Sequence, residues 1–195
     1  MSRRAAAVEE TRGRIVDATL ELHAEQGIAA TSWDEIARRA GVGVGTVYRH
    51  FPSVDELVPA CGQVARGLLD LPDPSDAPAL FAGTEERGAR VKRLVGEVFA
   101  IYERGAHIMR VARREQDVHP DVGHTVAKIE AVLDALVDAA LDPLDVALHQ
   151  RRLVRAIVDL WTWTALREQG LDAAEAVAAV SAMLACHLEA NSRSR

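Results

Sequence analysis

Apolar residues recur every three to four positions along most of this 195-residue chain, which is the period of an α-helix. No segment shows sustained alternation of apolar and polar residues between turn signals, so we predict an all-α protein. The first helix is expected over residues 11–26, because Thr11 is a suitable N-cap and Gly27 follows the last turn.

Two short helices are predicted next. Residues 33–40 follow Ser32, which can form a capping box with Glu35, and Gly41 ends this helix. A third helix of about two turns is expected from residue 44 to about residue 50, and Pro52 then stops it. Two short helices joined by a tight turn form a corner, and many all-α proteins contain one.

The fourth helix opens at Ser53, which can form a second capping box with Glu56. Pro59 lies about two turns in, where its missing N–H and its ring should kink the helix. Residues 71–83 carry three prolines and no helical pattern, so we expect the domain boundary in or near them. The expected organisation is an N-terminal three-helix domain of residues 1–52, a connecting helix and Pro-rich linker of residues 53–84, and a C-terminal helical bundle of residues 85–195.

The C-terminal part should contain several longer helices. They are expected over residues 85–105, 106–114, 122–141, 145–168 and about 172–190. The last two have apolar arcs wide enough to pack on two sides. One side would face the protein's own domain and the other a second subunit, or both would lie in a larger monomeric core, and the pattern leaves both readings open.

The distribution of charge indicates that any contact with nucleic acid is confined to one local face of the protein. The net charge is −6, and residues 1–60 hold seven Arg against nine Asp and Glu. Phosphate binding needs clustered Lys or Arg, so a DNA-binding surface would have its acidic residues turned elsewhere. No stretch approaches the length of a membrane span and no signal segment is evident, so we expect a soluble cytosolic protein. Cys61 and Cys186 lack the spacing of a disulfide framework or a zinc site.

The most informative stretch is residues 31–52, which read TSWDEIARRAGVGVGTVYRHFP. A capped short helix, an Ala-Gly turn and a second short helix are the layout of a helix-turn-helix, whose second helix enters the DNA major groove. The segment resembles the signature of the TetR family of transcriptional regulators. The matching positions are Ala40-Gly41-Val42, Gly45-Thr46-Val47-Tyr48, His50-Phe51 and Pro52, and the resemblance covers about the first 60 residues.

Helical geometry and the resemblance together assign the DNA-facing residues. Val47 and Phe51 are four positions apart and should pack inward, which leaves the rest of the third helix for DNA. Thr46 can bond a base edge or a phosphate, whereas Tyr48 and His50 resemble family positions that hold phosphates. Arg49 could reach a phosphate or a guanine. The predicted DNA-binding residues are Ser32, Val44, Gly45, Thr46, Tyr48, Arg49, His50 and Ser53.

Two positions depart from the family pattern, and four arginines need a separate interpretation. Family members often carry Lys where this chain has Val54, so one phosphate contact is expected to be missing. His23 stands where a bulky apolar residue is usual, and we interpret it as a partly satisfied core histidine. Arg3 and Arg4 would form either a minor-groove arm or a disordered tail, and we favour the tail. Arg38 and Arg39 are interpreted as a solvated face.

The resemblance implies a homodimer that uses its two C-terminal helices, a palindromic operator and a small-molecule effector, with repression as the usual outcome. Residues proposed to line the effector pocket are Phe99, Tyr102, His107, Met109, Arg110, Trp161 and Trp163, although core packing explains most of them equally well. The alternative function is a helical small-molecule-binding or protein-interaction module without sequence-specific DNA binding.

Other chemistry has no local signature in the sequence. Residues 113–121 with His124 gather possible metal ligands, but no pair has the i, i+4 spacing of a helical zinc motif, so we expect no metal. Phosphate-binding, dinucleotide-binding and serine-hydrolase motifs are absent, so neither a cofactor nor an enzymatic activity is expected.

Overall fold

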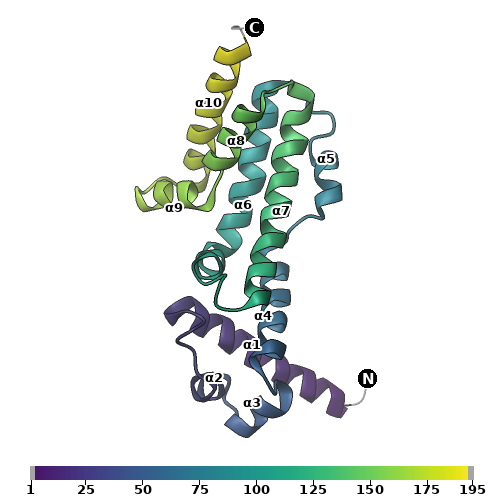
Figure 1. Cartoon of the computed structure of the whole chain (residues 1–195), viewed down its shortest axis with the longest axis vertical. Coiled ribbons are helices and arrows are strands. Elements are labelled where there is room, and N and C mark those ends of the chain that lie inside the picture. Colours follow the sequence, from purple (N-terminus) through teal and green to yellow (C-terminus); the bar gives the residue numbers. More distant parts are fainter. Residues whose placement is uncertain (1–2, 193–195) are drawn as a thin grey trace. The chain divides into compact units, whose positions relative to one another are not determined.

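The structure is a computed structural model that describes residues 3–192 (Figure 1). Its elements are α1 (Arg3–Gln26), α2 (Trp33–Ala40), α3 (Val44–His50), α4 (Val54–Leu69), η1 (Pro74–Asp76), α5 (Ala77–Leu80), α6 (Arg87–Arg114), α7 (Pro120–Leu141), η2 (Asp142–Leu144), α8 (Leu148–Ile157), α9 (Leu160–Glu168) and α10 (Ala173–Ser192). No strand occurs in this range, which confirms the predicted all-α fold. Within the same residues, no helix has both the length and the apolar composition needed to cross a membrane.

The chain divides into two compact units. Unit 1 contains the chain up to Leu68 together with His107–Ala127, and unit 2 contains Leu69–Ala106 together with the chain from Lys128 onward. Helices α6 and α7 therefore supply residues to both units. The linear boundaries expected after residues 52 and 84 stay a prediction, because a division by contacts follows packing and not chain order.

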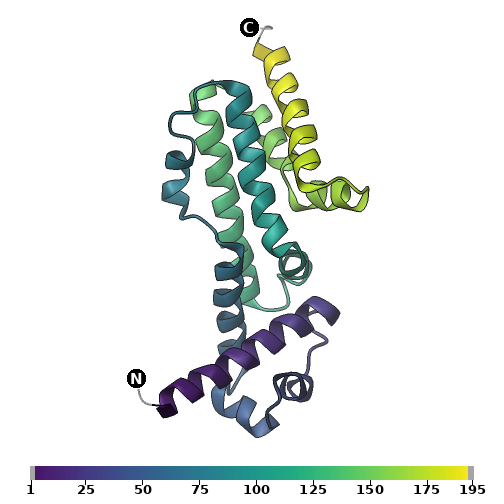
Figure 2. The same cartoon turned by 180° about the vertical axis from the view of Figure 1, so that it is seen from behind.

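The first three helices of unit 1 pack around one apolar core. Ile15 and Phe51 are fully buried there, and Ile36 of α2 packs with them. Figure 2 shows α1 lying across α2 and α3. The predicted signals around α2 are confirmed, because Ser32 accepts a bond from the N–H of Glu35 at 3.3 Å and the Glu35 carboxylate accepts one from the N–H of Ser32 at 3.0 Å.

The beginning of α1 differs from the prediction. The helix begins at Arg3, about two turns before the expected N-cap, and the Thr11 hydroxyl instead donates to the carbonyl oxygen of Ala7 at 2.9 Å. The interpretation of Arg3 and Arg4 as a disordered tail was therefore wrong. Three alanines and two glutamates follow these arginines, and both residue types favour helix strongly enough to extend it.

Helices α4 and α6 each have one interior residue, Pro59 and Gly105 respectively, at which a break could occur. Helix α4 is helical from Val54 to Leu69, through Pro59. Helix α6 departs from helical geometry at Gly105 (φ −157°, ψ 30°), where the junction between the predicted helices 85–105 and 106–114 falls. A Cβ atom on Gly105 would lie 2.5 Å from Cδ2 of Leu69, so the side chain at the end of α4 fills the space that glycine leaves.

The proline-containing stretch after α4 is partly helical, contrary to expectation. It forms η1 and α5, because the Asp73 side chain accepts a bond from the N–H of Ser75 at 2.9 Å and so starts the first turn. The capping box predicted between Ser53 and Glu56 is not formed among the described residues. The bond between the two is from the N–H of Glu56 to the main-chain oxygen of Ser53, at 3.3 Å.

Unit 2 is built on α6 and α7, which lie side by side in both views (Figures 1 and 2). Its buried cation is Arg90, which is only 7% exposed. Its guanidinium donates to four main-chain carbonyl oxygens, those of Ala139 and Ala140 in the last turn of α7 and those of Phe81 and Thr84. Arg90 thereby links the end of α7 to the turn before α6.

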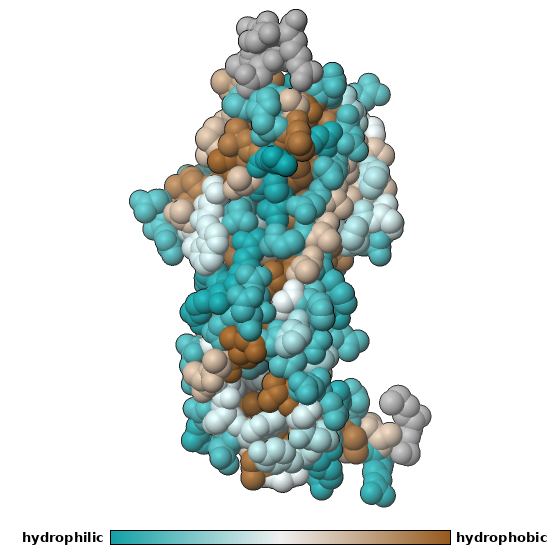
Figure 3. Space-filling view, in the orientation of Figure 1, coloured by the Kyte–Doolittle hydropathy of each residue, from teal (hydrophilic) through white to brown (hydrophobic). Residues whose placement is uncertain are grey.

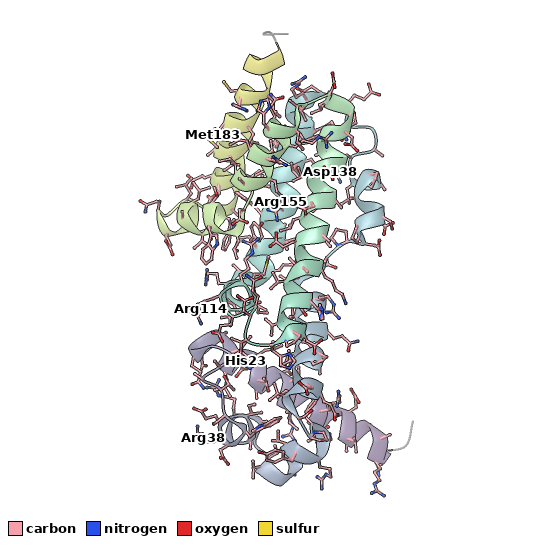
Figure 4. All side chains as sticks on the ribbon, viewed as in Figure 1. His23, Arg38, Arg114, Asp138, Arg155 and Met183 are labelled. Atoms are coloured by element: carbon pink, nitrogen blue, oxygen red, sulfur yellow. The ribbon has the colours of Figure 1, made fainter. Side chains whose placement is uncertain are left out.

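The single helix predicted over residues 145–168 was wrong. The structure has two helices there, α8 and α9, and Asp159 separates them. The Asp159 carboxylate accepts a bond from the N–H of Trp161 at 3.0 Å, which makes it the N-cap of α9. On α8, Arg155 reaches toward α7 (Figure 4) and pairs with Glu130 and with Asp134, the latter at 2.7 Å.

Candidate nucleic-acid interface

Helix α3 presents one exposed face and one buried face. Val47 and Phe51 are fully buried, as predicted, whereas Val44 and Tyr48 are 39% and 47% exposed. Gly45 has no heavy atom within 4 Å of a Cβ built on it, so the backbone is open to close approach on this side. An exposed, two-turn helix held by its buried residues has the form that enters a major groove.

Tyr48 is held in place by an aromatic neighbour. Its ring centroid lies 5.0 Å from that of Trp33, the first residue of α2, and the rings are inclined by 31°. This contact fixes the ring while almost half of the side chain stays exposed. The hydroxyl is consequently available to a hydrogen-bond acceptor such as a phosphate oxygen.

Two more predicted residues lie next to each other on α3. The Arg49 guanidinium lies 3.4 Å from the hydroxyl oxygen of Thr46, one helical turn earlier. Arg49 is exposed and Thr46 half-buried. The pair can therefore place a cation and a hydroxyl group against the same segment of DNA.

Arg12 of α1 is a site residue that the sequence analysis missed. Its guanidinium carbon lies 4.1 Å from the centre of the Phe51 ring, and it donates to the main-chain oxygen of His50 at 3.2 Å. A cation at the carboxyl end of α3 interacts favourably with the helix dipole and fixes the turn that leads to α4. No local signal identifies this role, because Arg12 and His50 are 38 positions apart.

The two predicted serines have different surroundings. Ser32 is committed to its capping box, and its hydroxyl also donates to the Glu35 carboxylate at 2.6 Å. These bonds from Ser32 lower the pKa of Glu35 and keep it negatively charged near the start of α2. Ser53 is half-buried just before α4. Both remain predicted phosphate contacts.

The arginines of α2 are arranged as a polar surface. Arg39 forms ion pairs with Glu21 at 3.1 Å and Glu25 at 2.7 Å, both on α1. Arg38 lies on the outer side of α2 (Figure 4) and is exposed. The ion pairs of Arg39 therefore tie α2 to α1 and withdraw its charge from a role on DNA.

A carboxylate just after α6, that of Glu115, caps the loop after α1. Oε2 of Glu115 accepts bonds from the N–H groups of Ile28 at 2.8 Å and Ala29 at 2.9 Å, and Arg114 lies 2.9 Å from the other oxygen. Burial acts to raise the pKa of Glu115, but these three bonds outweigh it and hold the pKa below its usual value. We call this arrangement the Glu115 latch.

His119, just before α7, is tied to the first turn of α4. Its Nδ1 accepts the N–H of Asp121 at 3.2 Å, so the neutral ring carries its proton on Nε2 and donates it to Asp55 at 2.8 Å. This contact lies one residue beyond Val54, where the missing lysine was noted. The start of α4 is thus held by the residue that precedes α7 as well as by the helix-turn-helix core.

The residues proposed for an effector pocket do not form one group. In unit 2, the ring centroid of Tyr102 lies 6.2 Å from that of Phe99 and 6.1 Å from that of Trp163. The Tyr102 hydroxyl donates to the main-chain oxygen of Val158 at 3.0 Å, and Trp161 is 54% exposed. The other three, which are His107, Met109 and Arg110, belong to unit 1. Their binding of an effector stays a prediction.

Each unit has one hollow of interest. In unit 1, a cavity of about 60 Å³ lies between α1, α4 and the unit 1 parts of α6 and α7. In unit 2, an open groove of about 650 Å³ follows α7 and α8 and is lined by Arg151, Arg155 and Trp161. No group of three or more His, Cys, Asp or Glu side chains that could hold a metal ion occurs in the described part of the chain.

The chain is similar to known transcriptional regulators. Residues 15–61 match the family described as "Bacterial regulatory proteins, tetR family". The HTH-type transcriptional repressor KstR of Mycolicibacterium smegmatis is 31% identical over 80% of this chain and 74% of its own length. A transcriptional regulator from Rhodococcus sp. Rha1 has the same fold, with a TM-score of 0.63 and 19% identity over 91% of this chain and 95% of its own. FadR from Bacillus subtilis, solved with stearoyl-CoA, gives a TM-score of 0.58 and 16% identity over 90% and 96%.

Proposed function

Because the chain belongs to the TetR family of bacterial regulatory proteins, we propose that it is a transcriptional repressor that leaves its operator when a small molecule binds. The observation that carries the proposal is the exposed face of α3. Tyr48 and Arg49 stand out from a helix whose other side is fully buried at Val47. Its place of action is then the cytoplasm, where the chromosome lies.

The DNA contacts divide into positioning and reading. Tyr48 and His50, with the N-terminal ends of α2 and α4 at Ser32 and Ser53, would hold phosphates. Thr46 and Arg49 would meet base edges, while Val44 and Gly45 allow only apolar contact and close approach. With so few hydrogen-bonding groups for bases, operator choice would also depend on the shape of the DNA.

A palindromic operator requires two recognition helices. A homodimer would place two copies of α3 about 34–36 Å apart, on successive major grooves. Unit 2 offers an apolar surface for this dimer. Figure 3 shows hydrophobic side chains among charged ones over α8 and α10. The exposed stripe on α10 consists of Ala179, Met183 and Cys186, and Leu153 of α8 is 38% exposed.

Release by a ligand would be a population shift between a DNA-competent and an incompetent form. A ligand changes this balance only by the difference in its affinity for the two forms. The Glu115 latch supports the proposal, because it ties the loop after α1 to the end of α6, and α6 also belongs to unit 2. The stearoyl-CoA held by FadR supports a small-molecule effector for this fold.

An electrophoretic mobility shift with the DNA upstream of the protein's own gene tests the proposal. We expect a shift that survives excess unrelated DNA, is lost in Arg49→Ala and is kept in Arg93→Ala, a matched exposed arginine of α6. A folded dimer that gives no sequence-specific shift at low salt would refute DNA binding. The remaining function would then be that of a helical binding module.

A further inference from the structure

The cavity in unit 1 is lined almost entirely by apolar side chains. Leu20, Val58 and Val111 line it, from α1, α4 and α6 respectively. Its volume of about 60 Å³ can hold an alkyl group of roughly two or three carbon atoms, since an engineered apolar cavity of about 150 Å³ holds the six carbons of benzene. Ala24 is a wall residue that is exposed, so a larger molecule could extend outward there.

The polar side chains of this wall are uncharged at neutral pH. Burial lowers the pKa of His23 to about 4, so its ring is neutral. Burial also raises the pKa of the Cys61 thiol to about 12, so the thiol keeps its proton. The charge of Glu115 acts on the His23 ring, but that carboxylate is already paired with Arg114 at 2.9 Å. An ion that entered this cavity would lose hydration without gaining an unpaired countercharge, so the wall selects against charged molecules.

His23 gives the cavity one hydrogen-bonding position. A neutral imidazole has one donor and one acceptor nitrogen, and no hydrogen bond to this ring occurs within residues 3–192. A hydroxyl or carbonyl oxygen of a bound molecule would satisfy it. An apolar wall with one such group is typical of sites that orient a small ligand.

The cavity is also joined to the Glu115 latch. Ile28 lines the cavity, and its N–H is the group that Glu115 holds at 2.8 Å. Ala112 lines the opposite wall less than one turn before Glu115. Leu20, a third wall residue, packs against the core that supports α3. A molecule in this cavity therefore contacts Ile28 of the latch, a residue less than one turn from Glu115, and the support of the recognition helix.

We propose that this cavity is the effector site, and that the effector is an uncharged molecule with a two- or three-carbon alkyl group beside a hydroxyl or carbonyl oxygen that forms a hydrogen bond with His23. The inference rests on the proposed function, because it assumes that a small molecule regulates DNA binding. It places the site in unit 1, apart from the aromatic cluster of Phe99, Tyr102 and Trp163.

The test uses the full-length protein and 1-propanol as the probe, with propanoate and propylammonium as charged analogues. Binding is followed by saturation-transfer NMR. We expect 1-propanol to bind and both ions to bind at least tenfold more weakly. Ala112→Leu, which fills the cavity, should weaken 1-propanol binding at least tenfold, whereas Ala127→Leu, at an exposed position of α7, should not change it. His23→Phe should weaken it about tenfold, as expected for one hydrogen bond.

Amide chemical shifts of the wild-type protein give a second measurement that needs no variant. Addition of 1-propanol should shift the amide signals of Ile28, Cys61 and Ala112 most. Shifts centred elsewhere, or equal binding in the Ala112→Leu protein, would overturn the assignment. A mobility shift of operator DNA is run separately. If the protein does not shift operator DNA even without probe, the proposed function is contradicted. If it shifts the DNA normally but binds no probe, only the cavity proposal is contradicted.

Discussion

Gly27 and Glu115 occupy mutually dependent places in unit 1. A Cβ atom on Gly27 would collide with Oε1 of the Glu115 carboxylate, and Gly27 has a φ of +93°, which favours glycine. The glycine that ends α1 thus also makes room for the side chain that caps the following loop. Gly27 and Glu115, which are 88 positions apart in the chain, therefore depend on each other for this contact.

Removing the carboxylate should destabilise the protein. Glu115→Ala leaves the N–H groups of Ile28 and Ala29 without their acceptor, and we expect the free energy of unfolding to fall by about 1–2 kcal/mol. Urea denaturation followed by circular dichroism measures it. Glu115→Gln keeps an acceptor oxygen and should lose less. Equal stability of the alanine variant and the wild type would show that water replaces the latch.

Stability should depend on pH through His23. Its pKa is 6.5 in the unfolded chain and about 4 in the folded one, because burial disfavours the charged ring. Protons therefore bind the unfolded state first. The free energy of unfolding has its full value above pH 6.5. It decreases as the pH falls toward 4, by at most about 3 kcal/mol. Thermal unfolding midpoints of wild type and His23→Phe, compared between pH 7 and pH 4.5, check this. An equal decrease of the midpoint in both proteins would contradict this prediction.

Two substitutions on α3 should have different effects on DNA binding. Tyr48→Ala removes a predicted phosphate contact, so affinity should fall about tenfold for all sequences alike. Thr46→Ala removes a predicted base contact and should change the ratio of affinities between operator variants. Fluorescence anisotropy with a set of single-base operator variants separates the two. The assignment of roles fails if both substitutions alter discrimination to the same extent.

Val54 offers a gain-of-function test. It is 45% exposed at the start of α4, where a lysine could reach a phosphate. Val54→Lys should bind operator more tightly, and the slope of log affinity against log salt should become steeper by about one. A salt titration of operator binding measures both, with Val54→Ala as the control. An unchanged slope would mean that this position does not approach DNA.

Dimerisation should depend on the exposed stripe of α10. Met183 lies on the outer side of this helix (Figure 4) and is 51% exposed. Met183→Glu would bury a charge in the proposed interface, so we expect a shift from dimer to monomer in sedimentation velocity. Val118→Glu, at a position of similar exposure in unit 1, is the control. A dimer that tolerates the Met183 variant would place the interface elsewhere.

Sequence reasoning succeeded where the signal and the structure lie within a few residues. Ser32 and Glu35 form the capping box at the start of α2, and Gly41 ends this helix in the left-handed conformation with φ +66°. The inward direction of Val47 and Phe51 follows from helical spacing alone. These features depend on local chemistry, so both boundaries of α2 and the first residue of α3 were predicted to the residue.

It failed where a local signal was outweighed or a partner was distant. Thr11 has the composition of an N-cap, but the alanines before it continue the helix. Asp159, a capping residue within an apolar pattern, was overlooked and separates α8 from α9. Glu115 and Arg12 join segments 87 and 38 positions apart, and no pattern along the chain records such pairs.

The stacking of Tyr48 on Trp33 has a spectroscopic consequence. The three tryptophans of the chain are Trp33, Trp161 and Trp163, and only the first lies in the helix-turn-helix. A protein with phenylalanine at the other two positions would have one indole, with its ring centroid 5.0 Å from that of the tyrosine proposed to grip DNA. The fluorescence of that indole would change when operator DNA binds, so binding could be followed in real time without an added dye.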